Sequence, residues 1–179
     1  MIVTSRTPLR VSLFGGGTDY PAYFERHRGA VIGFTINKYI YISALRLSSY
    51  VDYQYRLSYS KIEMVDDASR IQHPVVRALI ERYNCTNAMD FSVQADLPAS
   101  AGLGSSSAFT VGFINLISRL QGVPRTKLEL AREAIFVEQN LLGEHVGVQD
   151  QMHAAFGGIN RFDFENTSRF TIRPLDIRG

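Results

Sequence analysis

A turn rich in small residues lies in the middle of the chain and has the residue types of an anion-binding site. Between Leu97 and Ala108 the sequence reads LPASAGLGSSSA, and its three consecutive serines stand where a helical pattern begins. A helix start exposes unpaired N–H groups, glycines let a phosphate approach the backbone, and serine hydroxyls can donate to it or bind Mg²⁺. A serine N-cap after a flexible turn is the simpler alternative. We favour anion binding because these features converge on one helix start.

An acidic residue is expected on the buried face of a second helix. Helical spacing from about Arg125 to Leu142 places Glu138 near the middle of an apolar half, with apolar residues at i−4, i−3, i+3 and i+4. An ionised carboxylate is costly there unless it is paired or bound to a metal. Two interpretations stay open: an ion pair with one of the many arginines, or a ligand for a divalent metal beside the phosphate site.

Twelve residues after Glu138, Asp150 is expected to begin a short helix over residues 148–155. It could simply cap that helix, or it could act as a base or charge stabiliser beside a phosphoryl group in transfer. His145 and His153 have no close set of His, Cys or Asp that would form a zinc site. We interpret both histidines as ordinary surface residues or as residues that support a site from behind.

The elements that position these residues are strands and helices in an irregular order. That order favours an α+β fold over a doubly wound sheet, in which strands and helices alternate. Alternating β-prone residues predict strands at 2–14, 30–45, 50–59, 89–95, 159–164 and 170–172. Helical spacing predicts helices at 73–83, 105–121, 125–142 and 148–155.

The composition is that of one globular domain with a real core. The chain has 179 residues, of which 45% are hydrophobic and 20% charged, so disordered and collagen-like classes are excluded. A net charge of +2 is too small to suggest a nucleic-acid or anionic-membrane partner, and no apolar run reaches 18 residues. The single cysteine, Cys85, cannot form a disulfide within the chain. We therefore expect a soluble cytoplasmic protein.

Together these motifs resemble the GHMP kinases, the superfamily of galactokinase, homoserine kinase, mevalonate kinase and phosphomevalonate kinase. The family's phosphate loop, P-x-x-x-G-L-x-S-S followed by small residues, matches residues 98–108. Residues 138–151 resemble the galactokinase segment that carries a metal-binding Glu and, twelve residues later, the catalytic Asp. Residues 6–20 resemble the N-terminal substrate motif of sugar kinases. The three motifs occur in family order and span nearly the whole chain.

The resemblance implies a role for each matching residue. Mg²⁺ would be bound by Ser106 and Glu138, and the catalytic pair would be Asp150 with Arg10 beside it. The loop that binds the phosphates of ATP would comprise Pro98, Ser100, Gly102, Leu103, Gly104, Ser105, Ser106 and Ser107. The substrate motif would comprise Gly15, Gly16, Gly17, Thr18 and Asp19, with the Asp19 carboxylate accepting sugar hydroxyls.

The resemblance also implies a fold and a domain organisation. The fold would be that of a domain of ribosomal protein S5, a mixed sheet with helices on one side. Galactokinases have G-E-H-T-D where residues 15–19 read GGGTD, and the glycine-rich version looks most like D-glycero-D-manno-heptose 7-phosphate kinases. Family members usually carry a C-terminal domain with a third glycine-rich motif. We therefore expect residues 1–179 to be an N-terminal domain for ATP and substrate, with the C-terminal domain absent from this chain.

The function implied is an ATP- and Mg²⁺-dependent sugar kinase that phosphorylates the anomeric hydroxyl of D-glycero-D-manno-heptose 7-phosphate or a related sugar. Its partners would be that small sugar phosphate and its own C-terminal domain. One alternative is another sugar-1-kinase, of the L-fucose or galactose type. A second is a non-catalytic nucleotide- or sugar-binding module on the same fold. RNA binding is suggested by the ribosomal likeness alone, and the low net charge disfavours it.

Overall fold

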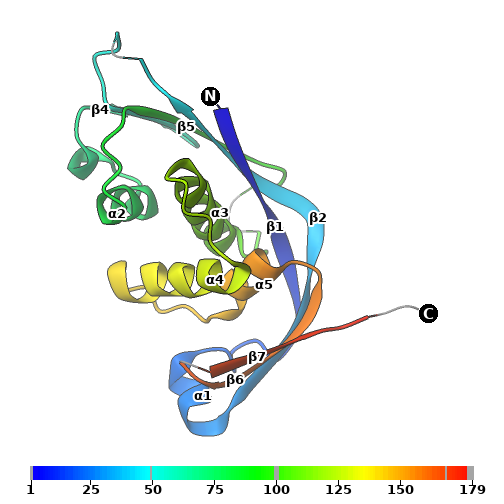
Figure 1. The fold of residues 1–179 in the computed structure, drawn as a ribbon. Coiled ribbons are helices and arrows are strands. Elements are labelled where there is room, and N and C mark those ends of the chain that lie inside the picture. Colours follow the sequence, from blue (N-terminus) through cyan, green and yellow to red (C-terminus); the bar gives the residue numbers. More distant parts are fainter. Residues whose placement is uncertain (1, 49, 99–100, 168, 177–179) are drawn as a thin grey trace.

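The computed structural model of the chain describes residues 2–48, 50–98, 101–167 and 169–176. Seven strands within these ranges form one mixed sheet, and the helices pack against one of its faces (Figure 1). The predicted α+β class, with a mixed sheet and helices on one side, is thus confirmed. In the described ranges no helix combines the length and the apolar character needed to cross a membrane.

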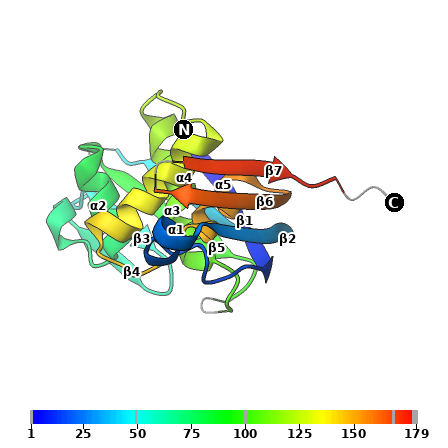
Figure 2. The same ribbon diagram turned by 90° about the horizontal axis from the view of Figure 1, so that it is seen from below.

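The long strand β2 (Gly29–Arg46) is the centre of the sheet. Strand β1 (Ile2–Phe14) pairs antiparallel with β2 along one side. On its other side β2 pairs first with β6 (Ile159–Asn166) and then with β5 (Met89–Ala95). The sheet is completed by β3 (Tyr55–Ser58), β4 (Ile62–Val65) and β7 (Arg169–Pro174), in the order β4-β3-β5-β2-β6-β7. Figure 2 shows β2, β6 and β7 side by side.

Helix α3 (Ser105–Leu120) is packed against β1 and β2 and between the other helices. Its neighbours are α2 (Pro74–Arg82), α4 (Lys127–Phe136) and α5 (Gln149–Phe156). Gly112 permits this close approach, because a Cβ at that position would lie 2.6 Å from Thr7 Oγ1. The middle of α3 therefore lies directly against β1.

Two apolar clusters hold the layers together. The larger fills the space between α2, α3 and the sheet and includes the touching rings of Phe91 and Phe113. The smaller surrounds Phe24 of helix α1 (Pro21–His27) and includes Met152 and Phe162.

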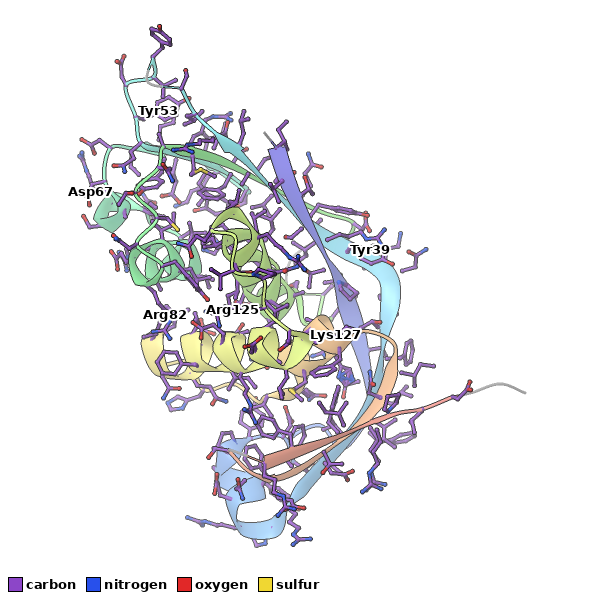
Figure 3. The ribbon with its side chains drawn as sticks, in the orientation of Figure 1. Tyr39, Tyr53, Asp67, Arg82, Arg125 and Lys127 are labelled. Atoms are coloured by element: carbon purple, nitrogen blue, oxygen red, sulfur yellow. The ribbon has the colours of Figure 1, made fainter. Side chains whose placement is uncertain are left out.

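Arg82 and Arg125 lie between α2 and α4 (Figure 3), where the Arg82 guanidinium donates to Glu133 at 2.6 Å.

Two predicted elements differ from the structure. The strand expected from residue 50 begins only at Tyr55, after a turn. The helix expected over residues 125–142 starts at Lys127, after a Thr126 capping box, and its regular part ends at Phe136. A π-helical turn, Val137–Leu141, follows and contains Glu138. Such turns insert one residue into the helical register, so they re-aim the side chains that they carry.

Two short elements were not anticipated. Helix α1 has seven residues of which only Phe24 is buried, so it leaves no apolar period in the sequence. Strand β4 has four residues, and Ile62 and Met64 on its outward face are more than half exposed. A 3₁₀ turn over Ala68–Arg70 links β4 to α2.

Candidate active site

The serine-rich helix start is held in place by strand β1. The residue before α3, Gly104, has φ +71°, a left-handed conformation that favours glycine. The Arg10 backbone N–H donates to Leu103 O at 3.1 Å, and Arg10 Nη1 donates to Gly102 O at 2.7 Å. The structure thus fixes the turn against the sheet. Pro98 lies at its entrance, and Ser100 lies outside the described residues.

Asp150 and Arg10 form the ion pair that the motif pattern implied. Asp150 lies in the first turn of α5, and Arg10 donates Nε to Oδ1 and Nη2 to Oδ2, both at 2.8 Å. This fork orients the carboxylate in a fixed plane. Burial raises the pKa of Asp150, and the adjacent guanidinium partly offsets that rise. A Cβ on Gly104 would lie 3.2 Å from Asp150 Oδ2, so the turn and the carboxylate are in close contact.

Glu138 is buried beside the same helix start, as the helical wheel predicted. Its side chain is 1% exposed, and Oε2 accepts hydrogen bonds from Ser107 Oγ at 2.9 Å and from Gln151 Nε2. Its other oxygen, Oε1, is buried with no hydrogen-bond partner among the described residues. Burial raises the pKa of this carboxyl, and the nearby Thr110 hydroxyl acts in the opposite direction together with the bonds from Gln151 and Ser107. The Thr110 hydroxyl itself donates to Ser106 O at 3.2 Å. Among the described residues no arginine pairs with Glu138, which contradicts the alternative of an ion pair there.

These groups share a cavity of about 210 Å³. Its lining includes Arg10, Asp19, Ser106, Ser107, Glu138, Glu144, Gln149 and Asp150. Four carboxylates face one guanidinium, so the cavity favours a cation or the cation complex of a phosphate. Within the described ranges, however, no group of three or more His, Cys, Asp or Glu residues could by itself hold a metal. A metal here would need donors from hydroxyls, water and its own ligand.

The N-terminal glycine motif is joined to α5. Asp19 is 1% exposed, and it accepts hydrogen bonds from Gly17 N at 3.0 Å and from Gln149 N and Nε2 at 3.2 Å each. The Thr18 hydroxyl donates to Gly15 O at 2.8 Å and bonds with the Ala30 backbone. Of the motif residues 15–19, Asp19 lines the cavity. The role of these residues toward a substrate stays a prediction.

A larger cavity of about 490 Å³ lies on the other side of the helix start. Ser105 and Ser106 line it together with the aromatic residues Tyr59, His73 and Phe109. His73 stacks on Phe109 at 4.7 Å between ring centroids and meets Tyr59 edge-on at 5.1 Å. Ile40, Val93 and Leu97 make part of its wall apolar. Sequence reasoning missed this cavity, because its residues come from five separate segments that no local pattern connects.

Three further residues escaped the sequence analysis or were placed wrongly. Gln149 accepts from Ser12 Oγ at 2.7 Å and donates to Asp19, and Gln151 donates to Glu138. The sequence could have indicated a role for both glutamines, because they lie on either side of Asp150. The surface interpretation is wrong for His153, which is fully buried 4.7 Å from the Phe162 ring, whereas His145 is exposed. His153 packs so closely on β2 that a Cβ on Gly33 would lie 2.3 Å from its Nε2.

Comparison with known proteins relates the sequence and fold of this chain to kinases. The family model for the GHMP kinases N terminal domain matches residues 54–158. A D-glycero-alpha-D-manno-heptose 7-phosphate kinase of Campylobacter jejuni is 30% identical over 99% of this chain and 55% of its own length. A galactokinase of Thermotoga maritima is 27% identical over 97% of this chain and 50% of its own.

A solved structure agrees with these relatives. A D-glycero-D-manno-heptose 1-phosphate kinase from Bacteroides thetaiotaomicron superposes with a TM-score of 0.87 and 26% identity, over 99% of this chain and 61% of that one. The chain spans about half the length of the curated relatives that it matches.

Proposed function

Because this chain belongs to the GHMP kinase family, we propose that it is the N-terminal, ATP- and acceptor-binding domain of a sugar kinase. One observation carries the proposal: Ser106, at the start of α3, lines both cavities. We call the larger cavity, lined by Tyr59, His73 and Phe109, the aromatic cavity. A nucleotide with its base there would extend its phosphates across the helix start toward Asp150. The helix N–H groups and the serine hydroxyls supply the donors that such phosphates need.

The proposed reaction transfers the γ-phosphoryl group of ATP to a sugar hydroxyl. The hydroxyl oxygen forms the new P–O bond, the bond to ADP breaks, and Asp150 accepts the hydroxyl proton or orients the hydroxyl. Burial raises the pKa of Asp150 toward the working pH, which improves it as a base, while Arg10 favours its ionised form. Since Arg10 also binds Gly102 O, it sets the distance between the phosphate turn and the base.

The residues beside the helix start fit a bound Mg²⁺. The unpartnered Glu138 Oε1 and the Ser106 hydroxyl, both at the smaller cavity, would hold it. Bound with the nucleotide, Mg²⁺ would supply charge neutralisation on the phosphates.

For the acceptor, we propose the anomeric hydroxyl of D-glycero-D-manno-heptose 7-phosphate. The name of the Campylobacter relative and the glycine-rich turn at residues 15–17 support it. Because other relatives are galactokinases, galactose is the alternative acceptor, and L-fucose is a second one of similar type.

The test uses the natural gene product that contains these residues, whatever its length. ADP release is measured with the heptose 7-phosphate, galactose, L-fucose and mevalonate. We expect the heptose phosphate to give the highest kcat/KM. Asp150→Asn should lower kcat by about 10²–10⁴-fold, the range of general-base contributions, with ATP affinity nearly unchanged.

The control is Asp52→Asn, in an exposed turn far along the chain from the site. An Asp150→Asn enzyme with an undiminished rate would contradict the mechanism. Binding of ATP without turnover of any of the four acceptors would favour the non-catalytic module instead.

A further inference from the structure

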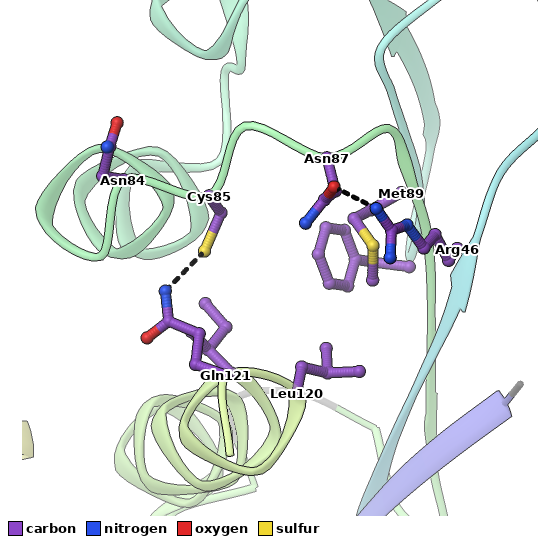
Figure 4. Close-up of a pocket in the computed structure, with 9 residues that line it drawn as sticks. Arg46, Asn84, Cys85, Asn87, Met89, Leu120 and Gln121 are labelled. Carbon is purple, nitrogen blue, oxygen red and sulfur yellow. Dashed lines mark hydrogen bonds between the residues drawn. The ribbon is translucent and has the colours of Figure 1, made fainter. Parts of the chain in front are cut away.

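A third cavity lies at the opposite end of α3 from the serine-rich turn. It has a volume of about 250 Å³ and lies between the ends of α2 and α3 and the β2–β5 pair (Figure 4). Its lining consists of Arg46, Asn84, Cys85, Asn87, Met89, Phe91, Ile117, Leu120 and Gln121. A 16-residue helix is about 24 Å long, so this cavity is separate from the proposed kinase site.

The interior of this cavity is apolar and well ordered by packing. Phe91 and Ile117 are each 1% exposed, and the Phe91 ring is fixed against Phe113 at 5.0 Å between centroids. Met89 and Leu120 extend the apolar surface. An apolar cavity of about 150 Å³ is large enough for a benzene ring. This one therefore has room for a single ring with a short chain.

The mouth of the cavity carries one charge. Arg46 lies opposite Met89 in the β2–β5 register, and its Nη2 donates to Asn87 Oδ1 at 2.5 Å. That bond uses one of the five guanidinium N–H groups, so the others can receive an anion. The nine lining residues include no carboxylate. Figure 4 shows Arg46 and Asn87 together on one side of the cavity and Cys85 with Gln121 on the other.

We propose that this cavity binds a small organic anion with an apolar body of about one ring and one terminal carboxylate. The ring lies among Phe91, Ile117 and Leu120, and the carboxylate reaches Arg46 at the mouth. The small volume favours a free molecule over a peptide segment, and the single positive charge favours a monoanion. The inference is independent of the proposed kinase function.

The probes are 3-phenylpropionate and its uncharged analogue 3-phenylpropan-1-ol, titrated into the protein by calorimetry. We expect 3-phenylpropionate to bind more tightly than the alcohol, because its carboxylate forms a charge-assisted hydrogen bond with Arg46. The second readout is alkylation of Cys85 by iodoacetamide, followed by mass spectrometry of the Cys85 peptide. Bound 3-phenylpropionate should slow this alkylation, since the half-buried Cys85 thiol lines the cavity.

Two variants test separately how much the Arg46 charge and the free volume of the cavity contribute to binding. Arg46→Gln should weaken 3-phenylpropionate about tenfold and leave the alcohol unchanged. Leu120→Trp should abolish binding of both probes by filling the space. The matched control is Arg119→Gln, an equal loss of charge at an exposed position that does not line the cavity.

Three results would overturn the proposal: no binding and no protection of Cys85, equal weakening by Arg46→Gln and Arg119→Gln, or unimpaired binding to a folded Leu120→Trp variant. If Leu120→Trp fails to fold, the comparison of the two arginine variants still decides.

Discussion

At the scale of single residues, Arg10 links more of the site than its place in a motif implies. Its guanidinium holds both oxygens of Asp150 and also Gly102 O, and its backbone N–H holds Leu103 O. One side chain thus joins strand β1 to the turn before α3 and to helix α5. This arrangement uses the planar fork of arginine, which lysine cannot reproduce.

We therefore expect Arg10→Lys to lower kcat by about 10²-fold, the cost of misplacing a reacting group by about 1 Å. The weaker, single-point contact should also leave Asp150 less stabilised as an anion, so its pKa rises. Since a base of the proposed kind acts in its ionised form, the acidic limb of the pH–rate profile should move to higher pH.

The measurement is kcat against pH for wild type, Arg10→Lys and Arg6→Lys. Arg6 is the matched control, because it is exposed and its guanidinium lies over the Tyr39 ring at 4.6 Å. Figure 3 shows Tyr39 on the side of the sheet away from the helices. A lower rate with an unchanged acidic limb would mean that Arg10 acts without changing the pKa of Asp150.

Sequence alone could place Glu138 in the interior but could not identify its partners. The helical wheel gives the direction of a side chain relative to its own helix, which is why the burial of Glu138 was predictable. Its partners Ser107 and Gln151 come from two other helices, and the π-helical turn at Val137–Leu141 sets the final aim of the carboxylate. The apolar spacing continues through that turn, so the sequence carries no sign of it.

At the scale of elements, predictability followed the strength of the pattern. Strands β1 and β5 have the predicted bounds, because each has one face in the core and alternates along its length. Helix α1 and strand β4 were missed because each has few buried residues. The aromatic cavity depends on one of these missed elements.

Strand β4 contributes a buried carboxylate that shapes the wall of the aromatic cavity. Glu63 accepts hydrogen bonds from the Tyr59 hydroxyl and from Gln72 N, both at 2.6 Å. Burial opposes ionisation of Glu63, but these hydrogen bonds prevail and lower its pKa. Glu63 thus ties Tyr59 to the segment that carries His73, and we expect it to be a positioning residue for the nucleotide base.

On that basis, Glu63→Gln should raise the KM for ATP about tenfold, the typical value of a hydrogen bond to a charged group, and leave kcat nearly unchanged. Tyr59→Phe, which removes one of the two bonds, should act in the same direction with a smaller effect. Steady-state kinetics with varied ATP give both parameters, and exposed Glu81→Gln is the control. A fall in kcat with constant KM would contradict a role at the base.

At the scale of the whole molecule, the close contact of α5 with the sheet encloses His153. The imidazole is fully buried, both ring nitrogens lack hydrogen-bond partners among the described residues, and Arg10 is the nearby charge that also opposes protonation. Burial lowers the pKa of His153 from 6.5 to about 4. The folded protein therefore holds this histidine neutral at a pH where the unfolded chain binds a proton.

The sign of the effect on stability follows from linkage. Between pH 6.5 and about 4 the unfolded state binds more protons at this position, so the free energy of unfolding falls as the pH falls. A difference of this size corresponds to about 3 kcal/mol in total. Glu138 and Asp150 have raised pKa values and act in the opposite direction, so the wild-type curve alone does not isolate His153.

The comparison with His153→Phe isolates it, because the variant keeps a ring against Phe162 and removes the titrating group. Urea unfolding at about pH 7.5 and about pH 4.5 should show wild type losing about 2–3 kcal/mol more than the variant. His145→Gln, at an exposed histidine, should leave the wild-type pH dependence unchanged. Equal losses in wild type and His153→Phe would mean that His153 gains a proton or a partner in the folded protein. In that event, α5 would pack less closely on β2 than in this structure, where a Cβ added to Gly33 would lie only 2.3 Å from His153 Nε2.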